Sequence, residues 1–297
     1  MKILLFGGSG QLGFEIRTRA HDLNFEVLSP VHSEVDIGER AQVQHFVANL
    51  QVDVVINCAA YTAVDKAEKE REQALRINRD GALHAAEAAK AHGVRLLHVS
   101  TDYVYAGDTR TLITESEPVR PLNYYGESKL AGEIAVQELL GADATILRTS
   151  SLHGQKGINF VNTMLKFFAE RPVVSVVNDQ FMCPTWAGWL AEVLLDLVRI
   201  PTQGVLHACG EGVVSWFDFA RAIHEMSIVQ ATNERSRAVI EPISAAAFNR
   251  PANRPAYSGM DCGKLTQILG RAPISWQKGL KRHLQELGVF AQTEVTG

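Results

Sequence analysis

The stretch FGGSGQLG, residues 6–13, follows a short apolar run at 2–7 and precedes a segment with helical spacing. Its glycines at 7, 8, 10 and 13 match both G-x-x-G-x-x-G and G-x-G-x-x-G. Between a strand and a helix, such glycines permit a tight turn and let the backbone approach a pyrophosphate at the helix N-terminus. A tight turn without any ligand is the alternative. The position directly after the first strand favours a dinucleotide site.

Beyond this motif, short apolar runs alternate with helical patterns. The apolar runs, rich in β-forming residues, lie at 2–7, 26–30, 52–60, 94–101 and 144–150. Helical spacing occurs between them, notably at 42–50 and 78–93. This alternation is typical of βαβ units and a parallel sheet, and strands that are almost entirely apolar need helices on both faces. We predict an α/β fold, a Rossmann-type doubly wound parallel sheet with a smaller C-terminal substrate-binding lobe.

The pattern changes near residue 150, where proline, aromatic and polar clusters become frequent. Two helical patterns stand out after that point, at 186–199 and 215–226. We therefore predict an NAD(P)-binding Rossmann domain over residues 1–150. Residues 151–297 are predicted to form mainly a substrate-binding domain, although some of these segments could pack as part of the first domain.

Composition and charge exclude several classes of protein. With 46% hydrophobic and 21% charged residues in 297, the chain is typical of a soluble globular protein. A net charge of −4 offers no basic field for nucleic acid or an anionic membrane. No uncharged run approaches the roughly 20 residues that span a bilayer. The four cysteines lack a C-x-x-C pair and the histidines lack metal-ligand spacing, so we assign no metal and expect a cytoplasmic protein that acts on a small metabolite.

The residues after the second apolar run bear on the choice of dinucleotide. A carboxylate about 20 residues beyond the glycines would bind the ribose 2′-OH of NAD. This run ends instead in Ser29, Pro30, His32 and Ser33. Glu26 lies early in the run, and no arginine is identified for a 2′-phosphate. Because the repelling acid is missing, we predict NADPH, with NADH not excluded. Asp36 and Ile37 could border the adenine, or Asp36 could equally be a solvated turn residue.

Candidate catalytic groups come from two later segments. The fourth apolar run ends in HVSTDYVYAG, which places Ser100 and Thr101 at the carboxyl edge of a parallel sheet, where α/β folds bind ligands. Tyr125 and Lys129 follow in NYYGESKLAGE, four residues apart and so on one helix face. A phenol has a pKa near 10, and a neighbouring ammonium stabilises its phenolate. Lys129 would thus tune Tyr125, the proton donor.

Tyr125 and Lys129 also have a purely structural interpretation. Tyr125 could be a packed aromatic at the start of a helix and Lys129 a solvated side chain, which is the better explanation for an isolated Y-x-x-x-K. The glycine motif and the hydroxyl residues at a strand end make the catalytic interpretation stronger.

Several motifs together resemble a known family. Besides the glycine motif they are NCAAYTAVDKAE (57–68), STDYVYAG (100–107), YYGESKLAGE (124–133), NDQFMCPT (178–185) and RPAYSGMD (254–261). In this order they resemble the extended short-chain dehydrogenase/reductases, and within them the branch that reduces a nucleotide-bound 4-keto-6-deoxy sugar. The resemblance spans almost the whole chain. The glycines and the Tyr-Lys pair are general to the family, whereas AAYTAVDKAE, STDYV and NDQ followed by PT are particular to this branch.

The resemblance implies roles for individual residues. Thr101, Tyr125 and Lys129 would form the catalytic triad, with Asp102 beside the sugar. Together with the glycine motif, the residues that would bind the cofactor are Gly7, Gly10, Gln11, Leu12, Gly13, Asp36, Ile37, Ala60, Tyr61, Thr62, Tyr125 and Lys129. The implied reaction is NAD(P)H-dependent reduction of the C4 keto group of dTDP-4-dehydro-L-rhamnose to dTDP-L-rhamnose, with Tyr125 protonating the oxygen and Thr101 polarising the carbonyl.

Two departures from the family's pattern concern the substrate. Ser151 stands where the family usually has a tryptophan, and Tyr257 where it usually has an asparagine. The predicted substrate residues are Thr101, Asp102, Ser151, Arg254 and Tyr257. Arg250 and Arg254 could clamp a diphosphate, or be solvated loop residues. A reductase or epimerase for another nucleotide sugar therefore stays open, as does a non-catalytic NADP-binding regulatory subunit.

Partners other than the nucleotide-diphosphate sugar have little support in the sequence. Glu15 matches a position at which some relatives bridge magnesium at a dimer contact, although a glutamate on a first helix is usually only exposed. We assign no metal ligand and leave a homodimer open.

Overall fold

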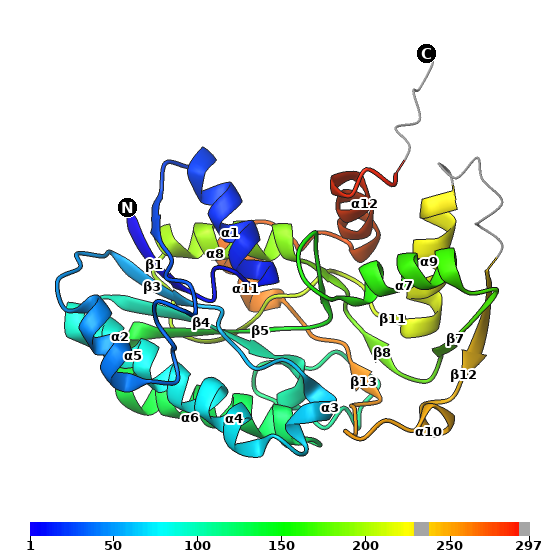
Figure 1. The fold of residues 1–297 in the computed structure, drawn as a ribbon, viewed down its shortest axis with the longest axis horizontal. Helices are drawn as coiled ribbons and strands as arrows, with labels where there is room; N and C mark the ends of the chain where they lie inside the picture. The colour runs from blue at the N-terminus through cyan, green and yellow to red at the C-terminus, as the bar shows by residue number, and fades with distance from the viewer. Residues whose placement is uncertain (229–237, 291–297) are drawn as a thin grey trace, which may run out of the picture.

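A six-stranded parallel sheet forms the larger part of the computed structural model, which describes residues 1–228 and 238–290 (Figure 1). Its strands are β1 (Lys2–Phe6), β2 (Glu26–Leu28), β3 (Val54–Asn57), β4 (Arg95–Thr101), β5 (Ala144–Thr149) and β10 (Gly204–His207). Their order is β10-β5-β4-β3-β1-β2, and every neighbouring pair is parallel. The predicted doubly wound sheet is confirmed.

Helices cover both faces of this sheet, as its apolar strands require. Along β1, Ile3 and Leu5 pack on one face while Leu4 and Phe6 pack on the other, because successive side chains of a strand alternate. One face is covered by α1 (Gln11–Asp22), α8 (Ala187–Arg199) and α11 (Gly263–Leu269). The opposite face is covered by α2 (Arg40–Val47), α5 (Gly81–His92) and α6 (Tyr124–Leu140).

The strand order reverses between β1 and β3. From β1 the chain moves outward to β2, then crosses back to β3 and continues through β4 and β5 in the other direction. A ligand crevice is expected at the carboxyl ends of the strands at such a reversal. The short elements that lie in the connections after β3, β4 and α6 are α3 (Val64–Ala67), α4 (Arg71–Leu75), the π-helical η1 (Arg76–Asp80), the 3-10 turn η2 (Asp102–Val104) and the 3-10 turn η3 (Gly141–Asp143).

A smaller lobe lies beside the carboxyl edge of the sheet, on the right in Figure 1. Its helices are α7 (Phe160–Glu170), α9 (Trp216–Ile228), α10 (Ala245–Phe248) and α12 (Trp276–Glu286). Its strands form the parallel pairs β7 (Val173–Val177) with β12 (Val239–Ile243) and β6 (Leu152–His153) with β9 (Thr185–Trp186), and a sheet of β11 (Val214–Ser215), β8 (Phe181–Met182) and β13 (Tyr257–Ser258). An apolar cluster that includes Val161, Phe219 and Leu280 joins α7, α9 and α12.

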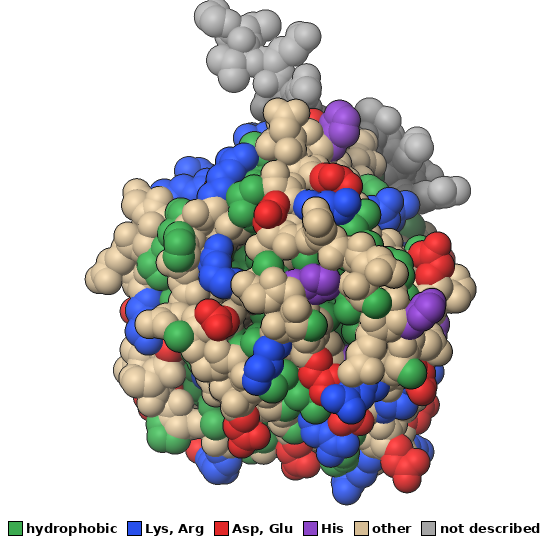
Figure 2. Space-filling view, turned by 90° about the vertical axis from the view of Figure 1, so that its left-hand side faces the viewer, with side chains coloured by type: hydrophobic (Ala, Val, Ile, Leu, Met, Phe, Trp, Pro, Cys, Tyr) green, Lys and Arg blue, Asp and Glu red, His purple; other side chains and the backbone are tan. Residues whose placement is uncertain are grey.

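The division at residue 150 is not a clean cut in space. The segment that contains α8 and β10 lies with the large sheet, where β10 pairs with β5 and α8 packs on α1. Residues 151–186 and much of 211–290 form the smaller lobe. Residues 229–237 and 291–297 of the predicted second domain lie outside the described residues. None of the described helices is long and apolar enough to cross a bilayer, and Figure 2 shows basic and acidic side chains interspersed on one face.

Candidate active site

The glycine motif forms a cradle that other residues could not form. Gly7 has φ +82°, and a Cβ added to it would lie 2.5 Å from the backbone nitrogen of Ala59. A Cβ on Gly13 would lie 2.3 Å from the carbonyl oxygen of Gly7. Gly10 is the N-cap residue of α1 and makes no side-chain hydrogen bond. No capping side chain therefore occupies the first N–H groups of the helix. This is an anion site of the kind that holds a pyrophosphate.

A cavity of about 330 Å³ lies next to the cradle, between β1, the segment after β2 and the end of β3. Of the residues predicted to bind the cofactor, it is lined by Gly7, Gly10, Ile37, Ala60 and Tyr61. Its other walls include Pro30 and Ile77. The cavity therefore continues from the phosphate cradle to an apolar recess suited to an adenosine.

The remaining predicted cofactor residues lie around this cavity in different ways. Leu12 is buried, and Gln11 accepts a hydrogen bond from Asn159 of the smaller lobe at 2.8 Å. Asp36 is not simply solvated, because its carboxylate accepts hydrogen bonds from Arg76 at 2.8 Å and from the Gly38 N–H at 2.9 Å. Burial would raise the pKa of Asp36, but these two donors outweigh it and the pKa lies below its usual value. Thr62 lines a second, larger cavity.

Tyr125 and Lys129 lie on the first turns of α6. The helix begins after Asn123, whose side-chain oxygen accepts the N–H of Gly126 at 2.9 Å and so caps the helix. Lys129 is buried, and its Nζ donates to the carbonyl oxygen of Val99 in β4 at 2.7 Å. This contact ties α6 to the strand that ends in Thr101.

The surroundings of Lys129 and Tyr125 set their proton affinities. Burial lowers the pKa of Lys129 to about 8, although the charges of Glu133 and Cys58 act to raise it. Burial raises the pKa of Tyr125, and a hydrogen bond with Thr101 opposes this rise. The phenol is therefore protonated at neutral pH and lies beside a hydroxyl at the strand end. Ser100 shares this edge, but its buried Oγ has no partner among the described residues.

Asp102 lies beside these groups at the start of η2, almost fully buried. Burial raises its pKa to about 6, against hydrogen bonds from Ser258, Ser150 and Thr101. Ser150 donates to Oδ2 at 3.1 Å, and Thr101 donates to Oδ1 at 3.1 Å. Ser150 and Ser258 were not predicted from the sequence. RTSS and RPAYSGMD contain both serines, but neither motif shows which hydroxyl faces Asp102.

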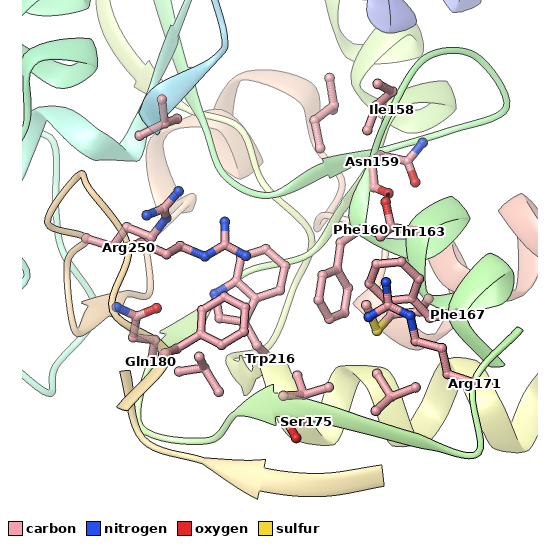
Figure 3. A pocket seen from close by; sticks show the side chains of 18 of the residues that line it. Ile158, Asn159, Phe160, Thr163, Phe167, Arg171, Ser175, Gln180, Trp216 and Arg250 are labelled. Atoms are coloured by element: carbon pink, nitrogen blue, oxygen red, sulfur yellow. Dashed lines mark hydrogen bonds between the residues drawn. The ribbon is translucent and has the colours of Figure 1, made fainter. Parts of the chain in front are cut away.

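The second cavity, about 870 Å³, opens beside this edge of the sheet and runs into the smaller lobe (Figure 3). Arg250 lies at one end, Trp216 and Phe160 in the middle, and Arg171 at the other end. The ring centroids of Phe160 and Trp216 are 4.6 Å apart. Tyr103, which follows Asp102 in η2, also lines the cavity and connects it to the catalytic groups.

Two arginines give one end of this cavity a positive charge. Arg254 donates to both carboxylate oxygens of Asp65 at 3.0 Å, and Arg250 lies 3.6 Å from the same carboxylate. One carboxylate thus faces two guanidinium groups, which leaves an excess positive charge. Both arginines line the cavity rather than pointing only to solvent. The charge suits a diphosphate.

The two residues that depart from the family pattern do not line this cavity. Ser151 has φ +46° and lies next to Ser150, with 3.4 Å between their Oγ atoms. Tyr257 is buried, and its hydroxyl lies against Gly259. Because neighbouring residues of a strand face opposite sides, the hydrogen bond of Ser258 to Asp102 directs Tyr257 away from the catalytic groups. Their predicted substrate roles stay predictions.

Glu15 is buried, although a glutamate on the first helix is usually exposed. It is 1% exposed and paired with Arg19, whose guanidinium also lies 3.3 Å from Glu286 and 3.5 Å from Glu192. Burial and the charge of Glu286 raise the pKa of Glu15 against the effect of Arg19. Among the described residues, no group of three or more histidine, cysteine, aspartate or glutamate side chains could hold a metal ion.

This arrangement is able to transfer a proton and a hydride to a carbonyl. A phenol and a hydroxyl lie beside each other at the carboxyl edge of the sheet, and a buried ammonium lies one helical turn after the phenol. A carbonyl placed beside Tyr125 would meet the proton donor there, and the cradle would hold a nicotinamide cofactor on the same edge of the sheet.

Comparisons with known proteins agree with this chemistry. The model of the RmlD substrate binding domain family matches residues 1–289. A dTDP-4-dehydrorhamnose reductase of Aggregatibacter actinomycetemcomitans is 38% identical over 94% of this chain and 97% of that protein. A probable dTDP-4,6-dihydroxy-2-methyloxan-3-one 4-ketoreductase of Streptomyces antibioticus is 37% identical over 97% of this chain and 96% of that protein. The crystal structure of dTDP-4-dehydrorhamnose reductase from Bacillus anthracis in complex with NADP has a TM-score of 0.90 and 35% identity, over 96% of this chain and 99% of that one.

Proposed function

The chain belongs to the RmlD substrate binding domain family, and on this premise we propose that it reduces the C4 keto group of dTDP-4-dehydro-L-rhamnose to dTDP-L-rhamnose with NADPH. The observation that carries the proposal is that Tyr125 lies beside Thr101 at the carboxyl edge of the sheet, on a helix whose buried Lys129 is hydrogen-bonded to the strand that ends in Thr101. A regulatory protein without turnover would have no need of a buried lysine one helical turn from a phenol at this edge of the sheet.

The residues around the cradle fit a dinucleotide. A Cβ at Gly7 or Gly13 would collide with backbone atoms, and the adjoining cavity of about 330 Å³ offers an apolar recess for the adenosine. The first N–H groups of α1 would hold the pyrophosphate, and Ile37 and Tyr61 would border the adenosine. When bound, NADPH supplies the hydride that reduces the carbonyl carbon.

The catalytic residues act on the carbonyl oxygen. Tyr125 donates its phenolic proton to the oxygen at C4 as negative charge develops there. Thr101, beside Tyr125, donates to Asp102 in this structure; when its hydroxyl turns from Asp102 to the substrate, it donates to the same oxygen and polarises the carbonyl. The ammonium of Lys129 stabilises the phenolate that remains, and its hydrogen bond to Val99 fixes the ammonium against β4.

The larger cavity supports a nucleotide sugar as the substrate. With the sugar at Tyr125 and Asp102, the diphosphate would lie at the Arg250 and Arg254 end. The aromatic middle of the cavity would then be free for the nucleoside. A volume of about 870 Å³ lies within the range of small-molecule sites, at its upper end.

A coupled assay tests this function. The purified protein is mixed with NADPH, dTDP-4-dehydro-6-deoxy-glucose and the 3,5-epimerase that converts this sugar, and the loss of reduced-nicotinamide absorbance is followed. We expect turnover with the parent protein and a kcat lowered about 10²- to 10⁴-fold in Tyr125→Phe. Tyr124→Phe, one residue away, is the matched control and should retain activity. If Tyr125→Phe turned over as fast as the parent, the catalytic assignment would fail.

A reductase for another nucleotide-bound keto sugar is the second candidate. It is favoured by the similarity to the probable 4-ketoreductase of Streptomyces antibioticus, which is named for a different nucleotide-bound keto sugar. NADPH oxidation with a different keto sugar, and none with the rhamnose precursor, would select this candidate. Binding of NADPH without turnover on any sugar would select the regulatory alternative.

We place the reaction in the cytoplasm. All four cysteines are free thiols, including Cys209 and Cys262, whose sulfur atoms lie 3.6 Å apart without a bond. A chain of this length with four cysteines and no C-x-x-C pair or disulfide framework is typical of a reducing compartment.

A further inference from the structure

Arg17 is an exposed cation at the edge of the predicted cofactor site. It lies on α1, four residues after Gly13 and thus one helical turn beyond the cradle. Its guanidinium lies 3.5 Å from the carbonyl oxygen of Gly8. Within the described part of the chain, 1–228 and 238–290, no carboxylate forms an ion pair with it. Its charge is therefore available to a ligand.

Three residues from separate segments meet at this point because position 8 has no side chain. A Cβ added to Gly8 would lie 1.8 Å from Oγ of Ser29 and 3.3 Å from Cδ of Arg17. Ser29 directly follows β2, the strand after which dinucleotide folds contact the adenosine ribose. A hydroxyl and a guanidinium thus lie together at the place where the ribose 2′ position is expected.

The charges around this point favour an anion. Pro30 and His32 follow Ser29 and line the cavity of about 330 Å³, where an NAD-selective site would carry a carboxylate. Glu26 is paired with Lys2, 2.8 Å away, at the other end of β2. Asp36 is paired with Arg76, and the Glu34 carboxylate accepts the N–H of Val31 at 2.9 Å.

We propose that Arg17 and Ser29 bind the 2′-phosphate of NADPH and make this chain selective for NADPH over NADH. The guanidinium donates charge-assisted hydrogen bonds to the phosphate, and the Ser29 hydroxyl adds a neutral donor. Because Gly8 has no side chain, the space between Arg17 and Ser29 is not filled. The assignment rests on the proposed function only in requiring a dinucleotide, because the identity of the sugar plays no part in it.

Binding without turnover tests the proposal. Isothermal titration of the full chain with NADP⁺ and with NAD⁺, which differ only in the 2′-phosphate, measures the preference directly. We expect the parent to bind NADP⁺ more tightly, and Arg17→Gln to weaken NADP⁺ binding about 10- to 100-fold while leaving NAD⁺ unchanged. Arg282→Gln, another exposed helix arginine, is the matched control and should leave both affinities unchanged.

Ser29→Asp provides the converse variant. A carboxylate there should repel the 2′-phosphate and accept the ribose 2′-OH, so the preference should reverse toward NAD⁺. Equal weakening of both nucleotides in Arg17→Gln, or no weakening of either, would overturn the proposal. If NADP⁺ selectivity behaves as expected but no keto sugar is reduced, the proposed reductase function fails and this assignment stands.

Discussion

At the scale of single residues, Lys129 shows how a buried charge is adjusted by its neighbours. Burial alone would lower its pKa strongly, and the carboxylate of Glu133, one turn further along α6, restores part of the loss. Glu133 is itself buried and receives hydrogen bonds from Arg148 in β5 at 3.0 and 2.5 Å. We infer that Glu133 affects catalysis through the pKa of Lys129, as a positioning residue.

Replacing Glu133 by Gln should move the alkaline limb of the pH profile. Lys129 keeps its proton below about pH 8 in the parent, so activity that depends on its charge is present below that pH and lost above it. Removing the carboxylate lowers the pKa of Lys129 further. The fall of kcat/KM should then begin at lower pH, and kcat/KM at pH 8 should drop several-fold. The measurement is kcat/KM of both proteins from pH 6 to pH 10.

Glu138→Gln, an exposed substitution on the same helix, controls for a general loss of negative charge on α6. Glu133→Gln also leaves Arg148 without a carboxylate, which costs on the order of 3 kcal/mol of stability. A loss of stability with an unmoved pH profile would show that Glu133 is structural only.

At the scale of elements, the approach of α6 to β4 decides where Tyr125 lies. The helix begins directly against η2, and a Cβ added to Gly126 would lie 2.2 Å from the carbonyl oxygen of Tyr103. A backbone oxygen cannot move aside as a flexible side chain can. The first turn of α6 therefore needs glycine next to Tyr125, independently of any role in catalysis.

Gly126→Ala should shift the start of α6 and lower kcat at least about tenfold, because small displacements of catalytic groups are costly. Gly132→Ala is the matched control, since its Cβ would also meet a backbone oxygen, that of Asn78, at 2.1 Å. Both variants should melt at lower temperature, but Gly132 lies six residues, or about 1.7 turns, further from the start of the helix and should affect kcat less. Equal loss of kcat in both would contradict this account.

At the scale of the whole molecule, buried histidines couple stability to pH. His98, His153, His207 and His283 are all buried. Burial lowers the pKa of His207 and of His283 to about 4, and those of His98 and His153 well below their usual value. His153 and His283 face each other with 3.0 Å between their Nδ1 atoms, so a proton on one disfavours a proton on the other.

The protein should therefore lose stability as the pH falls. Between about pH 6.5 and pH 4 the unfolded chain binds protons that the folded chain excludes, so the free energy of unfolding decreases with decreasing pH. Each histidine that stays neutral in the folded protein lowers the free energy of unfolding by about 1.4 kcal/mol for every pH unit that the pH falls within this window. The raised pKa values of Asp102 and Glu15 act in the opposite direction. Urea unfolding at pH 7 and pH 5 measures the difference, and equal stability at both would refute the account.

Much of the fold was predictable because it depends on local patterns. The five predicted strands are present in the main sheet, since runs of apolar residues with helices between them have few alternatives to a covered parallel sheet. Residues 204–207 were not predicted as its sixth strand. Their short run, GVLH, joins the sheet only through its pairing with β5, a contact between distant segments.

The sequence by itself determined the sheet, the glycine cradle and the helical spacing of Tyr125 and Lys129, because each depends on residues close together in the chain. Only the tertiary structure decided that Ser258 rather than Tyr257 faces Asp102, and that Arg17 meets Ser29 across Gly8. These contacts join segments whose separation in sequence says nothing of their distance in space. Which side chain faces the site then follows from strand register and helix packing, which are set by the buried core as a whole.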